Sequence, residues 1–326
     1  MDDDLASNRY NSPAPLSPPA LTPHPDLCLP DGNIAILTDK TYFIVHEGLL
    51  SRHSPVLQQL ANSLDPDAQR IESRPVLALE DTPQDMAFFL SALYDGVLLN
   101  LDIANFAALS ALLRLTTKYQ VKLRSSLLRE LQRTHWPIEL HQWDTREEQA
   151  ADNPHPILVI NLARACDAPR LLPSSFYDLS RHSLSEIAFG HVDPQTGVVH
   201  KLAPQDLMHL LKGREHASRF LSTFIVNELE GREPSANCLS KRLEDPGQRR
   251  TCQAAFESVT FEILRDVNGV THRSSDPLLA MLDAEVMQTR DNQLRACEYC
   301  RAEFGAVVDN ARQEFWSKLP VWFGLQ

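Results

Sequence analysis

The segment TYFIVHEGLLSRHSPVLQQL, residues 41 to 60, changes character in its middle and decides how the first part of the chain is interpreted. Residues 41 to 46 are rich in β-branched and aromatic side chains, which is typical of a strand. After His46 the apolar residues fall at helical spacing, and Ser54 before Pro55 is a typical pair for the start of a helix. The segment therefore predicts a strand followed by helices, with His46 at the junction.

The flanking segments extend this pattern into an α+β domain. Residues 33 to 39, NIAILTD, form a second β-type run, and a turn at Asp39-Lys40 joins the two runs into a predicted hairpin. Residues 75 to 81, PVLALED, predict a third strand. A helix opens at Thr82-Pro83 and ends at Tyr94-Asp95-Gly96, and residues 103 to 133 predict two more helices. These elements predict a three-stranded sheet with surrounding helices.

The order of these elements resembles a BTB/POZ domain. A strand hairpin is followed by His-x-x-Leu-Leu-Ser, a Ser-Pro helix, a strand, a helix that ends in Tyr-Asp-Gly, and a helical pair containing LLRLTTKYQVKLRSSLLREL. The positions that carry the resemblance are Phe43, Val45, His46, Leu50, Ser51, Ser54, Leu79, Asp81, Tyr94, Gly96 and Tyr119.

The resemblance implies a structural role for His46, at the end of a strand that leads into the first core helix. A half-buried imidazole in that place can hydrogen-bond nearby backbone. The residues point the same way, because no acid or cysteine near His46 has the spacing of a metal site or a catalytic triad. We therefore expect His46 to link strand and helix rather than to catalyse a reaction.

The chain divides by composition into four parts. Residues 1 to 28 are rich in proline and serine and predict a disordered tail. Residues 29 to 135 hold the domain that resembles BTB/POZ. Residues 136 to 156 mix prolines, charges and two tryptophans, and predict a linker. Residues 157 to 326 carry helical patterns and predict an all-α C-terminal domain.

This C-terminal part resembles the helical extension of BTB proteins from basidiomycete fungi. The matching phrases are LPSSFYDLS, LAPQDLMHLLKGRE, a paired cysteine near the end of the chain, and FWSKLPVWFGL. The last phrase concentrates aromatic residues near a terminus, and we expect it to dock onto the helical domain.

The charge of the chain and its apolar runs limit its partners. Forty-three acidic and 31 basic side chains give a formal charge of -12, which opposes binding to nucleic acid. The sequence carries no secretory signal and no apolar run of the roughly 20 residues that a membrane span needs. The expected location is cytoplasmic or nuclear, with the six cysteines reduced.

Four cysteines in the helical part are the candidate metal ligands: Cys238, Cys252, Cys297 and Cys300. Cys297 and Cys300 lie at i and i+3 on one predicted helix face, and two more thiols could complete a tetrahedral zinc site. The long gap between Cys238 and Cys252 argues against zinc, and free cysteine packs readily as a small apolar residue. A redox CxxC is a third interpretation, although no strand of a thioredoxin-like unit precedes it. We expect buried thiols, with zinc as the alternative and no other cofactor.

The sequence offers no recognisable catalytic constellation. It contains no Gly-rich phosphate loop, no GxSxG elbow and no HExxH helix, and its 12 histidines are scattered singly along the chain. We therefore predict that the protein is not an enzyme and that no residue is catalytic.

The expected function is protein–protein interaction. The resemblance implies that such a domain forms homodimers or binds other proteins, including cullin-type ubiquitin ligase scaffolds and transcriptional corepressors. A Pro-rich tail stands where many dimeric members have an amphipathic helix, and Leu57 stands where cullin adaptors carry a phenylalanine, with no glutamate at the motif that follows. The leading interpretation is a dimerisation or scaffold module. A substrate adaptor for a cullin-type ligase is the alternative, and an enzyme in the helical half is a more distant one.

Overall fold

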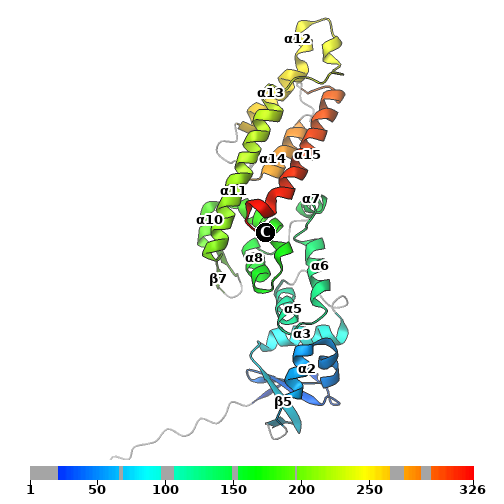
Figure 1. Cartoon of the computed structure of the whole chain (residues 1–326), viewed down its shortest axis with the longest axis vertical. Helices are drawn as coiled ribbons and strands as arrows, with labels where there is room; N and C mark the ends of the chain where they lie inside the picture. The colour runs from blue at the N-terminus through cyan, green and yellow to red at the C-terminus, as the bar shows by residue number, and fades with distance from the viewer. Residues whose placement is uncertain are drawn as a thin grey trace, which may run out of the picture. The chain divides into compact units, whose positions relative to one another are not determined.

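A computed structural model describes residues 21–65, 69–96, 106–148, 153–194, 197–264, 275–287 and 295–326 of the chain, whose elements are drawn in Figure 1. The fold is mixed α+β, with a five-stranded sheet near the N-terminus and helices over most of the rest. The chain forms two units, residues 1–101 with 115–122, and residues 102–114 with 123–326. Helix α5, Phe106–Lys118, contributes residues to both.

The sheet of the first unit combines antiparallel and parallel pairs. Its strands are β1 (Thr22–Cys28), β2 (Ile34–Thr38), β3 (Thr41–Val45), β4 (Arg70–Ile71) and β5 (Arg74–Leu79). Their order is β1-β3-β2-β5-β4. Strands β2 and β3 form the predicted antiparallel hairpin, β5 pairs parallel to β2, and the two outer strands complete the edges.

The sheet has five strands where the sequence predicts three, and β1 lies within the predicted disordered tail. The prediction of disorder therefore fails for residues 22 to 28. Pro23 and Pro25 cannot donate to a strand ladder, but β1 is an edge strand whose outer side needs no donors. Strand β4 has only two residues, too few to produce a periodic signal in the sequence.

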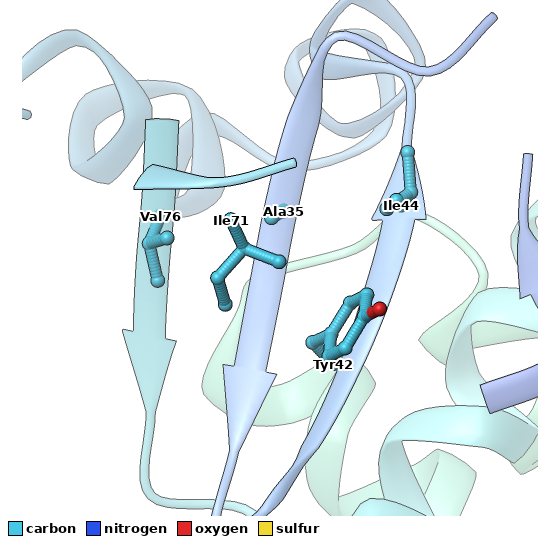
Figure 2. Close-up of a cluster of buried hydrophobic side chains, with 5 residues drawn as sticks. All are labelled: Ala35, Tyr42, Ile44, Ile71 and Val76. Atoms are coloured by element: carbon cyan, nitrogen blue, oxygen red, sulfur yellow. The ribbon is translucent and has the colours of Figure 1, made fainter. Parts of the chain in front are cut away.

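Alternation along the strands buries both faces of the sheet. Tyr42 and Ile44 of β3 point to one face, where they join Ala35, Val76 and Ile71 in the cluster shown in Figure 2. Phe43 and Val45 point to the opposite face and are fully buried. Because neither face of β3 meets water, this strand is apolar at nearly every position.

Two short helices follow β3, and Ser54 lies between them. Helix α1 spans Glu47–His53 and α2 spans Pro55–Asn62. The Ser54 hydroxyl accepts a hydrogen bond from Leu57 N at 2.9 Å and donates one to the carbonyl of Tyr119 at 2.6 Å. The predicted N-cap is therefore confirmed, and the same hydroxyl also ties α2 to the C-terminal end of α5 within the first unit. Helix α3, Pro83–Asp95, completes the helices that the structure describes between β5 and α5.

The second unit is predominantly helical, but it also contains a short two-stranded antiparallel sheet, so the prediction of an all-α domain is only partly correct. Its remaining elements are α6 (Arg124–Thr134), α7 (Leu140–Glu148), α8 (Pro156–Ala165), η2 (Pro169–Leu171), α9 (Leu172–Ser180), α10 (Leu184–Phe189), β6 (His191–Val192), β7 (Val199–His200), α11 (Pro204–Phe224), η3 (Ile225–Leu229), η4 (Ser240–Arg242), α12 (Pro246–Arg249), α13 (Thr251–Leu264), α14 (Pro277–Met287) and α15 (Glu298–Trp322).

The segment predicted as a linker, residues 136 to 156, contains helix α7 and packs into this unit. Trp136 is fully buried and Trp143 is 2% exposed. The Trp143 ring packs edge-on against Tyr177 and at a tilt against Trp316, with ring centroids 5.3 and 5.4 Å apart. The prolines and charges of this segment resemble a linker in composition, but burial of two large aromatic rings outweighs them.

The C-terminal aromatic phrase docks onto the helical unit, as the sequence predicts. Phe315, Leu319 and Phe323 are fully buried. Gly213 of α11 allows this close approach, because a Cβ there would lie 2.0 Å from the ring of Phe323.

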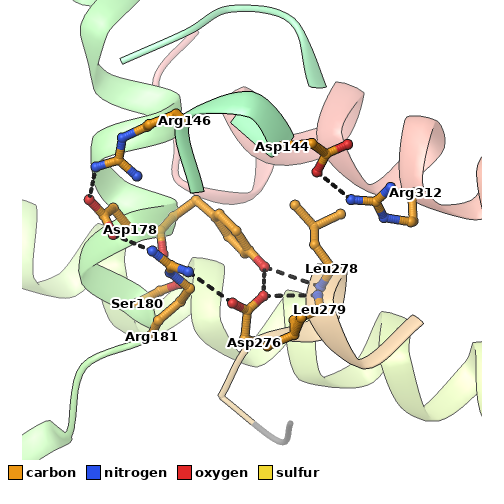
Figure 3. A network of polar contacts seen from close by, with 10 residues as sticks. Asp144, Arg146, Asp178, Ser180, Arg181, Asp276, Leu278, Leu279 and Arg312 are labelled. Atoms are coloured by element: carbon orange, nitrogen blue, oxygen red, sulfur yellow. Dashed lines mark hydrogen bonds and ion pairs between the residues drawn. The ribbon is translucent and has the colours of Figure 1, made fainter. Parts of the chain in front are cut away.

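A buried network of charged groups connects three segments of the second unit (Figure 3). Asp178 of α9 accepts from Arg146 at 2.6 Å and from Arg181 at 2.7 Å. Arg181 also contacts Asp276 at 2.9 Å, and Asp276 accepts from the Tyr177 hydroxyl at 2.6 Å. Burial raises the pKa of Asp178, but the two guanidinium groups more than offset this and hold that pKa below its usual value. Burial, reinforced by Asp276, raises the pKa of Tyr177 well above its ordinary value.

We expect Ser54→Ala to destabilise the first unit by about 1–3 kcal/mol, because it removes an N-cap and leaves the Tyr119 carbonyl without this donor. Urea denaturation of the full chain, followed by a probe in the first unit, measures the change. Ser63→Ala is the matched control, because the Ser63 hydroxyl is exposed and bonds only to the local Leu60 carbonyl among the contacts found. Equal effects of the two substitutions would contradict the role given to Ser54.

Candidate metal centre

The four candidate cysteines come from three segments of the second unit. Cys238 lies in the loop between η3 and η4, and Cys252 lies in the first turn of α13. Cys297 is the N-cap residue of α15, and Cys300 lies in the first turn of the same helix. None of the four cysteines forms a disulfide.

The structure brings the four sulfur atoms together. Their Sγ atoms all lie within 4.8 Å of one another. The Cys238 Sγ atom is 3.5 Å from that of Cys252 and 3.9 Å from that of Cys297. In a tetrahedral zinc site with metal–sulfur bonds of about 2.3 Å, neighbouring sulfurs are about 3.8 Å apart. The separations are therefore compatible with a zinc–thiolate centre.

Polar groups around the cluster are directed at the sulfur atoms. The Ser235 amide donates to Cys300 Sγ at 3.3 Å, and the Cys297 amide donates to Cys252 Sγ at 3.2 Å. The Ser240 hydroxyl lies 3.2 Å from Cys252 Sγ. Such donors stabilise negative charge on sulfur and orient ligands around a metal. They would serve a cluster of thiolates better than a cluster of neutral thiols.

Burial and hydrogen bonding affect the four thiols differently. Cys238, Cys252 and Cys300 are at most 2% exposed, whereas Cys297 is half-buried. Burial raises the pKa of Cys252 and of Cys300. Burial acts in the same direction on Cys297, but hydrogen bonds from the Cys300 and Leu239 backbone and from neighbouring thiols outweigh it and lower its pKa to about 7. Cys297 therefore loses its proton more readily than Cys252 or Cys300.

The sequence argument against zinc rested on the gap between Cys238 and Cys252, and the fold closes this gap. The intervening residues form η4 and α12 and return the chain to the cluster. Four sulfur ligands leave no position for water or substrate on a tetrahedral metal, which is the pattern of structural rather than catalytic zinc. The clustering is compatible with zinc, which the sequence analysis placed behind buried thiols.

The structure places His46 beside Tyr94 within the first unit. The His46 amide donates to the Tyr94 hydroxyl at 3.0 Å, and His46 Nδ1 lies 2.9 Å from the same oxygen. His46 Nε2 is 3.2 Å from the carboxylate of Asp31, which is 82% exposed. The ring thus joins the end of β3 to α3, an arrangement that fits a structural role.

Other positions singled out by the sequence are connected as well. Asp81 accepts from Lys118 at 2.7 Å and from the Tyr119 hydroxyl. The Tyr119 ring packs on Phe89, with centroids 5.6 Å apart. Leu50, like Phe43 and Val45, is fully buried, Ser51 is half-buried in α1, and Gly96 ends α3 with a φ of 80° that favours glycine.

The sequence analysis missed a group of three histidines. His155, His182 and His191 line one cavity of about 570 Å³ together with residues of α10. The His155 ring stacks on His191 at 4.3 Å and lies 5.2 Å from His182. The three residues are far apart in the sequence, so no local pattern connects them. Only the packing of α8 against the α9–β6 segment brings their rings together.

Burial lowers the pKa of His155 to about 4, and the adjacent imidazoles of His191 and His182 add to this effect. The carboxylates of Asp178 and Glu186 act in the opposite direction without overcoming it. Burial also lowers the pKa of His191. His155 and His191 are therefore neutral at pH 7.

Comparison of the sequence with protein-family models and with curated proteins finds no match in either set. Among the helices that the structure describes, none combines the length and the apolar composition that a bilayer-spanning segment requires.

We expect the stability of the second unit to fall as the pH falls from about 6.5 to about 4. Over that range the unfolded chain binds a proton at His155 near its ordinary pKa, whereas the folded chain resists it. Because the ring is only half-buried and solvent screens it, the expected loss is about 1–2 kcal/mol. Urea denaturation at a series of pH values measures it.

His155→Asn keeps a side-chain acceptor for the Ile157 amide and removes the titrating ring, so this part of the pH dependence should flatten. Substitution of the exposed His141 by asparagine is the matched control. An unchanged pH profile in the His155 variant would show that another group is responsible.

Proposed function

We propose that the protein is a non-enzymatic protein-interaction module, with a first domain of BTB/POZ type and a helical C-terminal domain whose fold is held by zinc. A cytoplasmic or nuclear location forms part of the proposal. The exposed apolar patch described below is the observation that carries the interaction function.

The contacts of the first unit support the resemblance to BTB/POZ domains. Positions quoted for that resemblance bond to one another: His46 with Tyr94, Ser54 with Tyr119, and Asp81 with Tyr119. Domains with the same fold are expected to carry the same residues at positions whose side chains make the same contacts. This supports the assignment through the side chains rather than through element order alone.

The exposed apolar side chains are found in the second unit. A dimer through the first strand and first core helix would need an apolar patch there, but the large hydrophobic residues that are exposed among the described positions all follow residue 137. Five of them fall close together in sequence, on α10 and the β6–β7 hairpin. They are Leu184, Phe189, Val192, Val198 and Val199, with exposed fractions of 43% to 66%. We call this set the α10–hairpin patch.

We infer that these side chains mark a contact surface, because exposed apolar area is unfavourable in water. We propose a second copy of the chain as its occupant. A two-fold contact brings the same patch from both copies together, and uncharged side chains are complementary to themselves in such a contact. Self-association would then occur through the second unit rather than through the first.

We expect the full chain to dimerise in a concentration-dependent manner, and Phe189→Asp with Val199→Asp to raise the dimer dissociation constant at least tenfold. Each buried charge would lack a partner, which costs more than about 1.4 kcal/mol. Light scattering across a range of concentrations measures the effect. Val226→Asp, at a position 57% exposed outside the patch, is the matched control.

A monomer whose patch captures a different protein would retain the interaction function and refute self-association. Copurification of a cullin through the patch would favour the adaptor alternative. A strict monomer that captures no protein, and that turns over a small molecule, would refute the module.

For the metal, we expect elemental analysis to find about one zinc per chain and a chelator to lower the thermal stability of the helical part. The apparent binding energy of a structural zinc, on the order of 10 kcal/mol, becomes folding energy when the apo site is disordered. Cys238→Ser should reduce the zinc content to near zero. Cys28→Ser, at a half-buried thiol of the first unit, should leave zinc content unchanged. Zinc-free protein of unchanged stability would contradict the site.

A further inference from the structure

Access to the four thiols is unequal. Cys252, Cys238 and Cys300 are 0%, 1% and 2% exposed, so a small reagent from solvent cannot reach their sulfur atoms directly. Cys297, the N-cap residue of α15, is half-buried. A dissolved oxidant therefore meets Cys297 first.

The geometry also supplies a reaction partner for Cys297. Its sulfur lies 3.9 Å from that of Cys238, and a disulfide requires about 2.05 Å. Cys252 and Cys300 belong to the helices α13 and α15, whose backbone hydrogen bonds hold them in place. Cys238 lies on irregular chain between η3 and η4, so it can approach Cys297 without breaking a helix.

We propose that this cluster is an oxidation site, at which a peroxide converts Cys297 and Cys238 into a disulfide and thereby releases the metal. The release of metal rests on the zinc site proposed above. The site of oxidation and the identity of the disulfide rest on access and geometry alone.

The chemistry balances with hydrogen peroxide as the oxidant. The Cys297 thiolate attacks one peroxide oxygen, the O–O bond breaks, and the departing hydroxide takes up a proton to become water. Cys297 is then a sulfenic acid, oxidised by two electrons. The Cys238 thiolate attacks its sulfur, the S–O bond breaks, and the second hydroxide is protonated to water. Two thiolates, one peroxide and two protons thus yield one disulfide and two water molecules.

The disulfide removes two of the four ligands, and zinc held by two sulfurs dissociates far more readily. The new bond nonetheless keeps the loop of Cys238 attached to the start of α15. Oxidation would therefore exchange a metal link for a covalent one between the same two segments. Reduction in the presence of zinc would restore the first state.

The test treats the full-length reduced protein with stoichiometric hydrogen peroxide, blocks the remaining thiols, and maps disulfides by peptide mass spectrometry. A colorimetric zinc indicator follows metal release in the same sample. The expected result is a peptide pair joined through Cys238 and Cys297, with about one zinc released per disulfide. Cys28 is the internal control, because it is also half-buried but outside the thiol cluster, and it should form no intramolecular disulfide at this dose.

The outcomes separate the two proposals. Protein without zinc that still forms the Cys238–Cys297 disulfide supports the oxidation site and refutes the metal. Zinc-loaded protein that forms another disulfide, or none, refutes the oxidation site and leaves the metal intact. Cys300→Ser provides a second check, because the same disulfide should still form in that variant if it folds, whereas its loss there would show that Cys300 is the resolving thiol.

Discussion

The buried carboxylate of Asp178 is the constraint on which the helical unit depends. A charge removed from water requires partners, and loss of one partner from a buried pair typically costs about 3–5 kcal/mol. Its partners are Arg146 from α7 and Arg181, which in turn holds Asp276 at the start of α14. The helices α7, α9 and α14 must therefore be assembled together. This explains why the segment that resembles a linker is folded: it supplies one of the two cations that keep Asp178 ionised.

In the first unit, buried polar groups are satisfied by single residues that each hydrogen-bond to two partners. The Tyr94 hydroxyl meets both the backbone and the ring of His46, and the Ser54 hydroxyl caps α2 while it satisfies the Tyr119 carbonyl. The Ser54 hydroxyl, the Tyr119 carbonyl and the Tyr94 hydroxyl thus each find a partner on a neighbouring element. Loss of such a side chain would remove two contacts at once. A few polar groups, each bonded to two partners, thus fix strand β3 and helices α2 and α3 in position.

In the second unit, the buried thiol cluster and the exposed apolar side chains lie on different residues. The thiol cluster connects the η3–η4 loop, α13 and α15 and faces inward, so its contribution is to the fold. The five side chains of the α10–hairpin patch are exposed to solvent, and the proposed contact surface is based on this exposure. The half-buried Cys297 belongs to the same cluster and is its most exposed thiol. It therefore links the interior of the cluster to the solvent.

The sequence by itself determined the features that depend on neighbours along the chain. The β2–β3 hairpin, the N-cap at Ser54 and the i, i+3 pair of Cys297 and Cys300 all follow from local spacing, because turns, caps and helix faces are set within a few residues. Tertiary structure alone decided which distant segments meet. Residues 22 to 28 became an edge strand because β3 offered an open edge, and Cys238 and Cys252 reached the other thiols because the loop between them folds back. The group of His155, His182 and His191 and the α10–hairpin patch likewise depend on which surfaces pack together and which remain exposed to water. The periodicity of the sequence does not indicate this.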